Sequence, residues 1–125
     1  MRKEPISPKG VFEPKGWSHA IRAGNTIYLA GMGGFDEQQK VVEGGFEGQA
    51  VKALENMKLI LEAAGASFKD VVKITTYLTN MNDLSKFREI RARYFSPPMP
   101  ASTTVEVSRL LPEMLIEIEA VAVVV

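Results

Sequence analysis

The sequence contains no cysteine and only one histidine, His19, among its 125 residues. Without cysteine, disulfides, thiolate metal sites and cysteine nucleophiles are excluded together. Because protein metal sites usually combine several side-chain ligands, a single histidine also excludes a multi-histidine site within one chain. We therefore expect no metal site.

An excess of charge is missing as well, since fifteen basic residues balance fifteen acidic ones. A basic excess would favour non-specific nucleic-acid binding, so we do not expect nucleic acid as a partner. Long apolar runs are also missing: the run "AVAVVV" near the C-terminus is far too short to span a bilayer. The N-terminal "MRKEPISPKG" lacks the apolar segment of a secretory signal, so we expect a soluble, cytoplasmic protein with no membrane partner.

What the sequence does contain fits one globular domain over residues 1–125. Hydrophobic residues make up 46% of the chain. At this length roughly two-thirds of the unfolded surface can be buried, which is enough for a core without disulfides or metals. The sequence therefore predicts a single domain with its own core.

Hydrophobic periodicity predicts the elements of an α/β fold. Residues 1–17, rich in proline and lysine, are expected to form an extended arm, and residues 31–46, with two glycine pairs, a loop. Helices are expected at 47–64 and 83–95, the second capped by Asn82 or Asp83. Strands are expected in 19–31 (two, around a turn at Gly24-Asn25), 70–80, 102–110 and 114–124. The order β-β-α-β-α-β-β predicts one sheet with two helices covering one face.

The last predicted strand is apolar on both faces toward its C-terminal end. Ile118 and Ala120 alternate with Glu119, Val121 and Val123. Two helices cover only one face, so an exposed Val121/Val123 stripe would remain on a monomer. The pattern therefore predicts that other subunits bury the second face.

Several side chains are candidates for chemistry, and each has a plainer interpretation. Glu117 and Glu119 could act as an acid and a base, or could be solvated surface residues. His19 lies close to Trp17, as in many pockets, although a lone histidine is more often simply hydrogen-bonded. Arg88 forms a basic edge with Arg91 at i+3, a pattern typical of a solvated helix face.

A cluster of hydroxyl groups stands at the start of a predicted strand in "PASTTVEV". Ser102, Thr103 and Thr104 could line a ligand site, or Thr103 and Thr104 could be ordinary strand-edge threonines.

Three segments together resemble the YjgF/Rid family of reactive intermediate deaminases: "AIRAGNTIYLAG", "QAVKALENMKLILEAAGASFKDVVKITTYLTNMNDL" and "VEVSRL…LIEIEAVAV". The resemblance spans residues 16–124. It implies a chorismate-mutase-like fold and a homotrimer with a central barrel and three clefts between neighbouring subunits. It also implies hydrolysis of reactive enamines and imines to ketoacids and ammonia, without a cofactor.

The resemblance implies some site residues directly. Glu117 corresponds to the glutamate that positions water, and Gly31 to the glycine whose backbone faces the ligand. Trp17 stands where an aromatic residue, commonly tyrosine, lies near the cleft. Arg88 stands at a helix position that is commonly asparagine, and Ala30 at one that is commonly serine.

One departure from the family pattern concerns the group that binds the substrate. The family motif P-A-R-S/T reads Pro100-Ala101-Ser102-Thr103 here, so Ser102 replaces the carboxylate-binding arginine. Three explanations remain open. Arg88 could restore the cation from the helix side. The substrate could be larger or could lack an α-carboxylate, with Trp17 stacking on a flat or conjugated portion of it. Catalysis could also be lost.

Three functions follow from these alternatives. The first is a cofactor-free hydrolytic deaminase of enamine, imine or conjugated amino-acid intermediates, with Glu117 as the catalytic group and Trp17, Gly31 and Arg88 around the substrate. The second is a non-catalytic, regulatory protein that binds a small metabolite. The third is an endoribonuclease or translation inhibitor, an activity described for family members, which the zero net charge does not favour.

Overall fold

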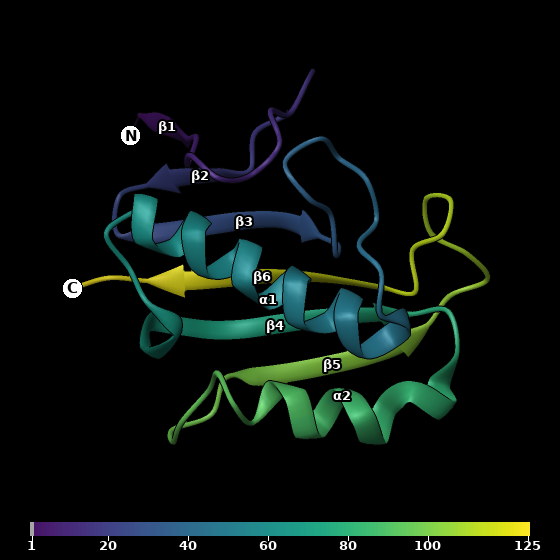
Figure 1. Ribbon diagram of the computed structural model, residues 1–125. Coiled ribbons are helices and arrows are strands. Elements are labelled where there is room, and N and C mark those ends of the chain that lie inside the picture. The colour runs from purple at the N-terminus through teal and green to yellow at the C-terminus, as the bar shows by residue number, and fades with distance from the viewer. Residues whose placement is uncertain (1) are drawn as a thin grey trace.

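Residues 2–125 are described by a computed structural model, shown in Figure 1. The strands are β1 Lys3–Ile6, β2 Ala20–Ala23, β3 Thr26–Met32, β4 Val71–Leu78, β5 Ala101–Glu106 and β6 Ile116–Val123. The α-helices are α1 Gly45–Ala63 and α2 Leu84–Arg91, and short 3-10 turns η1 Phe68–Asp70 and η2 Met81–Asp83 precede β4 and α2.

The strands form one mixed sheet in the order β1-β2-β3-β6-β4-β5. Strands β4 and β5 are parallel, and the other neighbouring strands are antiparallel. The last strand, β6, lies between β3 and β4 near the middle of the sheet (Figure 1). The predicted class, one mixed sheet with two helices, is confirmed.

The N-terminal arm contains a strand that the sequence did not predict. Strand β1 pairs with β2, with Lys3 opposite Ala23 and Ile6 opposite Ala20. Its four residues "KEPI" are mostly exposed and show no apolar alternation. Pro5 lacks an N–H, so it is tolerated only because β1 is an edge strand.

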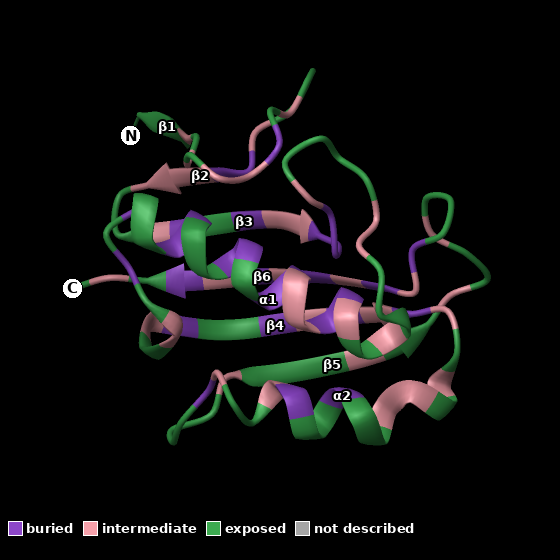
Figure 2. Cartoon of the chain, in the orientation of Figure 1, coloured by how far each residue is buried: buried purple, intermediate pink, exposed green. Residues whose placement is uncertain are grey.

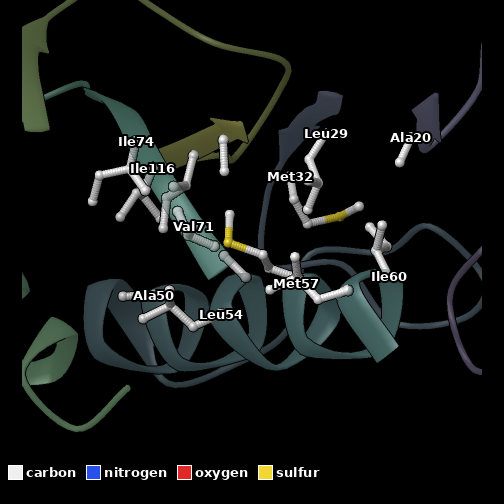
Figure 3. Packing of buried hydrophobic residues seen from close by; sticks show 14 of the residues in the cluster. Ala20, Leu29, Met32, Ala50, Leu54, Met57, Ile60, Val71, Ile74 and Ile116 are labelled. Carbon is white, nitrogen blue, oxygen red and sulfur yellow. The ribbon is translucent and has the colours of Figure 1, made fainter. Parts of the chain in front are cut away.

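The core lies between α1 and one face of the sheet. Figure 3 shows Leu54, Met57 and Ile60 of α1 packed beneath side chains of the strands. These positions recur at three-residue spacing, so one stripe of the helix is buried. Along β6, Ile116, Ile118, Ala120 and Ala122 face this core and are buried, as predicted.

The opposite face of the sheet, called the open face below, is not covered within one chain. Glu117, Glu119 and Val121 on β6 are partly exposed, and Val123 is exposed (Figure 2). Tyr28 of β3 is 53% exposed, whereas its neighbours Ile27 and Leu29 are buried in the core. An apolar stripe therefore lies at the surface of the single chain.

Helix α2 is shorter than the predicted helix over 83–95. Asn80 accepts a hydrogen bond from the Asn82 backbone N–H at 2.9 Å, and this cap starts the turn η2. Asp83 is the N-cap of α2 but makes no side-chain capping bond. Asp83 therefore occupies one of the two predicted cap positions, and the side-chain capping bond belongs to Asn80 at the start of the preceding 3-10 turn.

None of the helices within residues 2–125 has the length and apolar character needed to cross a bilayer. The same residues hold no group of three or more histidine, aspartate or glutamate side chains arranged to bind a metal ion.

Candidate functional site

A β-bulge interrupts the pairing of β3 with β6 at one end of the sheet. Leu29 pairs with Ala120 and Met32 with Ile118, so Ala30 and Gly31 together oppose Glu119. A bulge bends its strand and re-aims the residues beside it. Here it turns the backbone at Gly31 toward the neighbouring strand β6.

The backbone of Gly31 lies directly against the carboxyl group of Glu117. A Cβ atom at Gly31 would lie 2.7 Å from Glu117 Cδ and 2.8 Å from its Oε2. Those distances are shorter than van der Waals contact allows, so only glycine permits the Glu117 side chain to occupy this position. The two residues identified from the sequence are therefore brought together.

The Glu117 carboxyl lies in an environment that favours its protonated form. It is half-buried, and burial, together with the negative charge of Glu119, raises its pKa above the ordinary value of 4.5. No ion pair within residues 2–125 includes either glutamate. A carboxyl whose pKa is raised toward neutrality is suited to move a proton both ways.

Tyr77, which the sequence analysis did not single out, completes this acidic cluster. It pairs with Glu117 across β4 and β6, and its hydroxyl donates a hydrogen bond to the Glu119 carboxylate. That hydrogen bond, and then burial, raises the pKa of Tyr77. Glu117, Glu119 and Tyr77 thus form an acidic cluster on the open face.

Trp17 and His19 lie next to the bulge, at the end of the N-terminal arm. The His19 carbonyl accepts a hydrogen bond from the Ala30 N–H at 2.9 Å, which fixes the arm beside Gly31. Trp17 is 44% exposed, and its ring packs edge-on against His19, with ring centroids 5.1 Å apart. Trp17 is therefore an accessible aromatic surface near Gly31.

His19 itself is only 1% exposed and does not present its imidazole at the surface. Its Nε2 lies 2.6 Å from the Phe12 carbonyl oxygen, so Nε2 carries the proton and donates it. Nδ1 is buried without a hydrogen-bond partner. In the single chain His19 makes a structural contact, since it holds the arm through Phe12 and packs against Trp17.

The hydroxyl cluster of β5 is divided between the two faces of the sheet. In the parallel pairing of β4 with β5, Ser102 lies beside the buried Ile74 and Thr104 beside the buried Thr76. Both therefore point to the helix side. Thr103 pairs with Thr75 on the open face, where its hydroxyl accepts a hydrogen bond from Lys73 Nζ at 3.2 Å.

A pocket of about 310 Å³ lies between α2 and β5, lined by Leu84, Arg88, Arg91, Ser102 and Thr104. Arg91 Nη1 donates a hydrogen bond to Ser102 Oγ at 3.1 Å. Burial, and then the positive charge of Arg88, lowers the pKa of Arg91. We call this the arginine pocket.

The arginine pocket and the acidic cluster do not meet within one chain. Glu117 lies on the open face of β6, whereas Ser102 lies on the helix side of β5, and β4 runs between these strands. Arg88 reaches the same pocket as Ser102, as the sequence suggested, but the guanidinium bonded to Ser102 belongs to Arg91. The i+3 spacing, which places Arg91 on the same helix face as Arg88, was the sequence feature that could have identified Arg91 as a pocket residue.

Comparison with known proteins places these features in a family. Residues 12–124 match the sequence model of the family described as Endoribonuclease L-PSP. A RutC family protein of Pyrococcus horikoshii is 47% identical over 122 residues, covering 96% of this chain and 97% of the relative. The 2-iminobutanoate/2-iminopropanoate deaminase of Homo sapiens is 41% identical over 108 residues, covering 86% of this chain and 79% of the human protein.

A solved structure agrees with the sequence comparison. The crystal structure of RidA from an Antarctic Psychrobacter bacterium superposes with a TM-score of 0.92 at 36% identity, covering 97% of this chain and 99% of that one. Fold and sequence point to the same group of proteins, and the chain belongs to the YjgF/Rid family, also described as Endoribonuclease L-PSP.

Proposed function

We propose that this protein is a cofactor-free hydrolytic deaminase that converts reactive imines or enamines of amino acids to 2-oxo acids and ammonia. The position of Glu117 carries the proposal: a half-buried carboxyl with a raised pKa, held against the bare backbone of Gly31. Relatives in the family are named as deaminases of 2-iminobutanoate and 2-iminopropanoate, among them the human protein. This common chemistry supports the assignment.

In the proposed reaction Glu117 handles every proton that moves. Its carboxylate accepts a proton from water as the water oxygen bonds to the imine carbon. The same carboxyl then returns a proton to nitrogen, giving a tetrahedral carbinolamine. Glu117 then takes the hydroxyl proton and passes it to the nitrogen, so that the C=O bond forms as the C–N bond breaks and ammonia leaves. One water is consumed for each C=N bond hydrolysed. A group that accepts and then donates works best when its pKa is near the working pH, which agrees with the direction of the Glu117 shift.

We further propose that the complete site forms between neighbouring subunits of a homotrimer. The apolar stripe on the open face, with Tyr28 53% and Val123 40% exposed, would be buried by such assembly. The acidic cluster of one subunit would then face the arginine pocket of the next. This pairing would place a carboxyl group and guanidinium groups on either side of one substrate.

A non-catalytic, metabolite-binding function is the second candidate. It is favoured by Ser102, where the family pattern has an arginine, and by Ala30, where it has a serine. Such a protein would keep the cleft and lose the reaction.

One assay separates the two. An amino-acid oxidase generates the imine in place, and ammonia release is followed with and without the full-length protein. The deaminase function predicts release faster than spontaneous hydrolysis, in proportion to protein concentration. Binding of the 2-oxo acid without any acceleration, over a range of amino-acid precursors, would instead support the second function.

A further inference from the structure

The arginine pocket contains two positive charges and no negative one. Arg88 and Arg91 are three residues apart on α2, so they lie on the same face of the helix. Both line the pocket of about 310 Å³ with Leu84, Ser102 and Thr104. None of the five lining residues is acidic, so the pocket carries a net charge of about +2 at neutral pH.

The acidic side chains nearby are engaged elsewhere. Glu89, which follows Arg88, forms an ion pair with Lys86 at 3.1 Å. Glu106, on the same side of β5 as Ser102, accepts a hydrogen bond from the Met81 N–H at 2.8 Å. No ion pair within the described residues includes Arg88 or Arg91. The two guanidinium groups thus repel each other with no protein anion between them.

The two arginines differ in how firmly they are held. Arg91 donates to Ser102 Oγ, and its guanidinium stacks over the Phe87 ring at 5.3 Å from the centroid. Such contacts pre-orient the guanidinium and lower the entropy cost of binding an anion. Arg88 is exposed and has no hydrogen bond from its side chain to the described residues. One cation is therefore fixed and the other adjustable.

The size of the pocket exceeds what a single carboxylate group needs. Its volume of about 310 Å³ falls at the lower end of the roughly 300–1,000 Å³ usual for small-molecule sites. Ser102 is short, so it leaves this space free, and with Thr104 it adds hydroxyl groups that can donate to carboxylate oxygens.

We propose that the arginine pocket selects substrates with two carboxylates, namely the imines and enamines of dicarboxylic amino acids. Arg91 binds the carboxylate next to the reacting carbon, and Arg88 binds the carboxylate at the end of the side chain. Two negative charges then match two guanidinium groups, each through a charge-assisted pair of hydrogen bonds. With a monocarboxylic substrate, Arg88 has no carboxylate to bind. The inference rests on the proposed function for the reaction itself, but its binding preference can be measured without turnover.

The test measures binding of two product-like 2-oxo acids to the assembled full-length protein by calorimetry at fixed ionic strength. 2-Oxoglutarate, with two carboxylates, is expected to bind at least about tenfold more tightly than 2-oxobutanoate, with one. Arg88→Met is expected to weaken 2-oxoglutarate by about tenfold to a hundredfold and to leave 2-oxobutanoate nearly unchanged. Arg91→Met is expected to weaken both ligands.

Arg93→Met is the matched control. Arg93 follows the end of α2, pairs with Glu47 and does not line this pocket. It should leave both affinities unchanged. Arg88→Lys keeps the charge without the guanidinium fork, and intermediate binding by this variant would show that a loss in Arg88→Met does not come from misfolding.

Equal affinity for the two 2-oxo acids would overturn the proposal. Inorganic phosphate binding as tightly as 2-oxoglutarate would overturn it too, since the pocket would then be a general anion site. A dicarboxylate preference without ammonia release would uphold this inference and contradict the proposed function. Rapid ammonia release from monocarboxylic imines, without a binding preference for dicarboxylates, would support the proposed function and contradict this inference.

Discussion

The acidic cluster and the arginine pocket are two regions of opposite charge, and neither takes part in an ion pair within the described residues. In the acidic cluster, Glu117 and Glu119 are close enough for one to raise the pKa of the other. In the arginine pocket, Arg88 lowers the pKa of Arg91. Like charges held together cost stability unless something else gains from them. The repetition of this arrangement with both signs in one chain supports the proposal that the two regions form two halves of one site.

The two regions also differ in how the fold holds them. The acidic cluster lies on central strands, where the bulge at Gly31 and the pairing of β4 with β6 fix its members. The arginine pocket lies at the sheet edge, where β5 has no neighbour beyond it and α2 supplies the cations. The central region is therefore held by strand pairing on both sides, and the edge region by one strand and one helix.

The largest effect is expected from Glu117→Gln, which removes the group that handles protons but keeps its shape. Ammonia release from the imine should fall by about 10²–10⁴-fold, the usual contribution of a general acid–base group. Binding of 2-oxo acids should change much less, because the arginine pocket is intact. Unaltered turnover in this variant, on a substrate that the wild-type protein hydrolyses, would show that the acidic cluster is not catalytic.

The next effect tests whether the two regions serve one site across subunits. Glu117→Gln and the double variant Arg88→Met/Arg91→Met are each expected to be poorly active on a dicarboxylic imine. In trimers assembled randomly from equal amounts of both, about a quarter of the clefts combine an intact acidic cluster with an intact arginine pocket. Activity should therefore return toward a quarter of the wild-type value after the subunits are unfolded together and refolded.

Mixing without unfolding is the control for this experiment, since assembled oligomers exchange slowly and should show no gain. If co-refolded mixtures have only the average activity of the two variants, the two regions do not form a common cleft.

The sequence predicted the acidic cluster better than the arginine pocket, and the difference has a physical cause. Glu117 lies on a strand with clear alternation, so its face follows from local pattern, and Gly31 was identified through the family resemblance. The side to which Ser102 points depends instead on its register beside Ile74 in a parallel pairing, which no local pattern reveals. The partnership of Arg91 with Ser102 follows from that register and was missed for the same reason.

The fold itself was largely predictable from periodicity, and the exceptions were short or irregular. The helix α1, Gly45–Ala63, has five turns of apolar spacing and agrees closely with the predicted helix over 47–64. The four-residue β1 carries no such signal and exists only through its pairing with β2. The place of β6 between β3 and β4 likewise depends on tertiary pairing rather than on sequence order.

A smaller effect is expected from Gly31→Ala, which tests how tightly the acidic cluster is held. The new methyl group would lie 2.7 Å from Glu117 Cδ, so the Glu117 side chain must move. Overpacking of this kind costs about 1–3 kcal/mol in the free energy of unfolding. This cost is measured by urea unfolding of Gly31→Ala in the wild-type protein and in the Glu117→Ala variant. In the Glu117→Ala variant, which lacks the long side chain, the cost should largely disappear. An equal cost in both backgrounds would mean that the strain comes from the backbone and not from Glu117.

The smallest effect is a dependence of stability on pH that belongs to the acidic cluster alone. The pKa of Glu117 is raised in the folded protein, first by burial and then by Glu119, above an ordinary value of 4.5. Between these two pKa values the folded state binds more protons than the unfolded state, so the free energy of unfolding falls as pH rises. Glu117→Gln removes this titration. The free energy of unfolding of the variant, relative to that of the wild type, should therefore increase as pH rises from 4.5 to neutrality. Urea midpoints at equal protein concentration across this range measure the difference. A wild-type protein that gains stability relative to Glu117→Gln over the same range would mean that the folded state favours the ionised carboxylate, and the proton-handling role of Glu117 would lose its electrostatic basis.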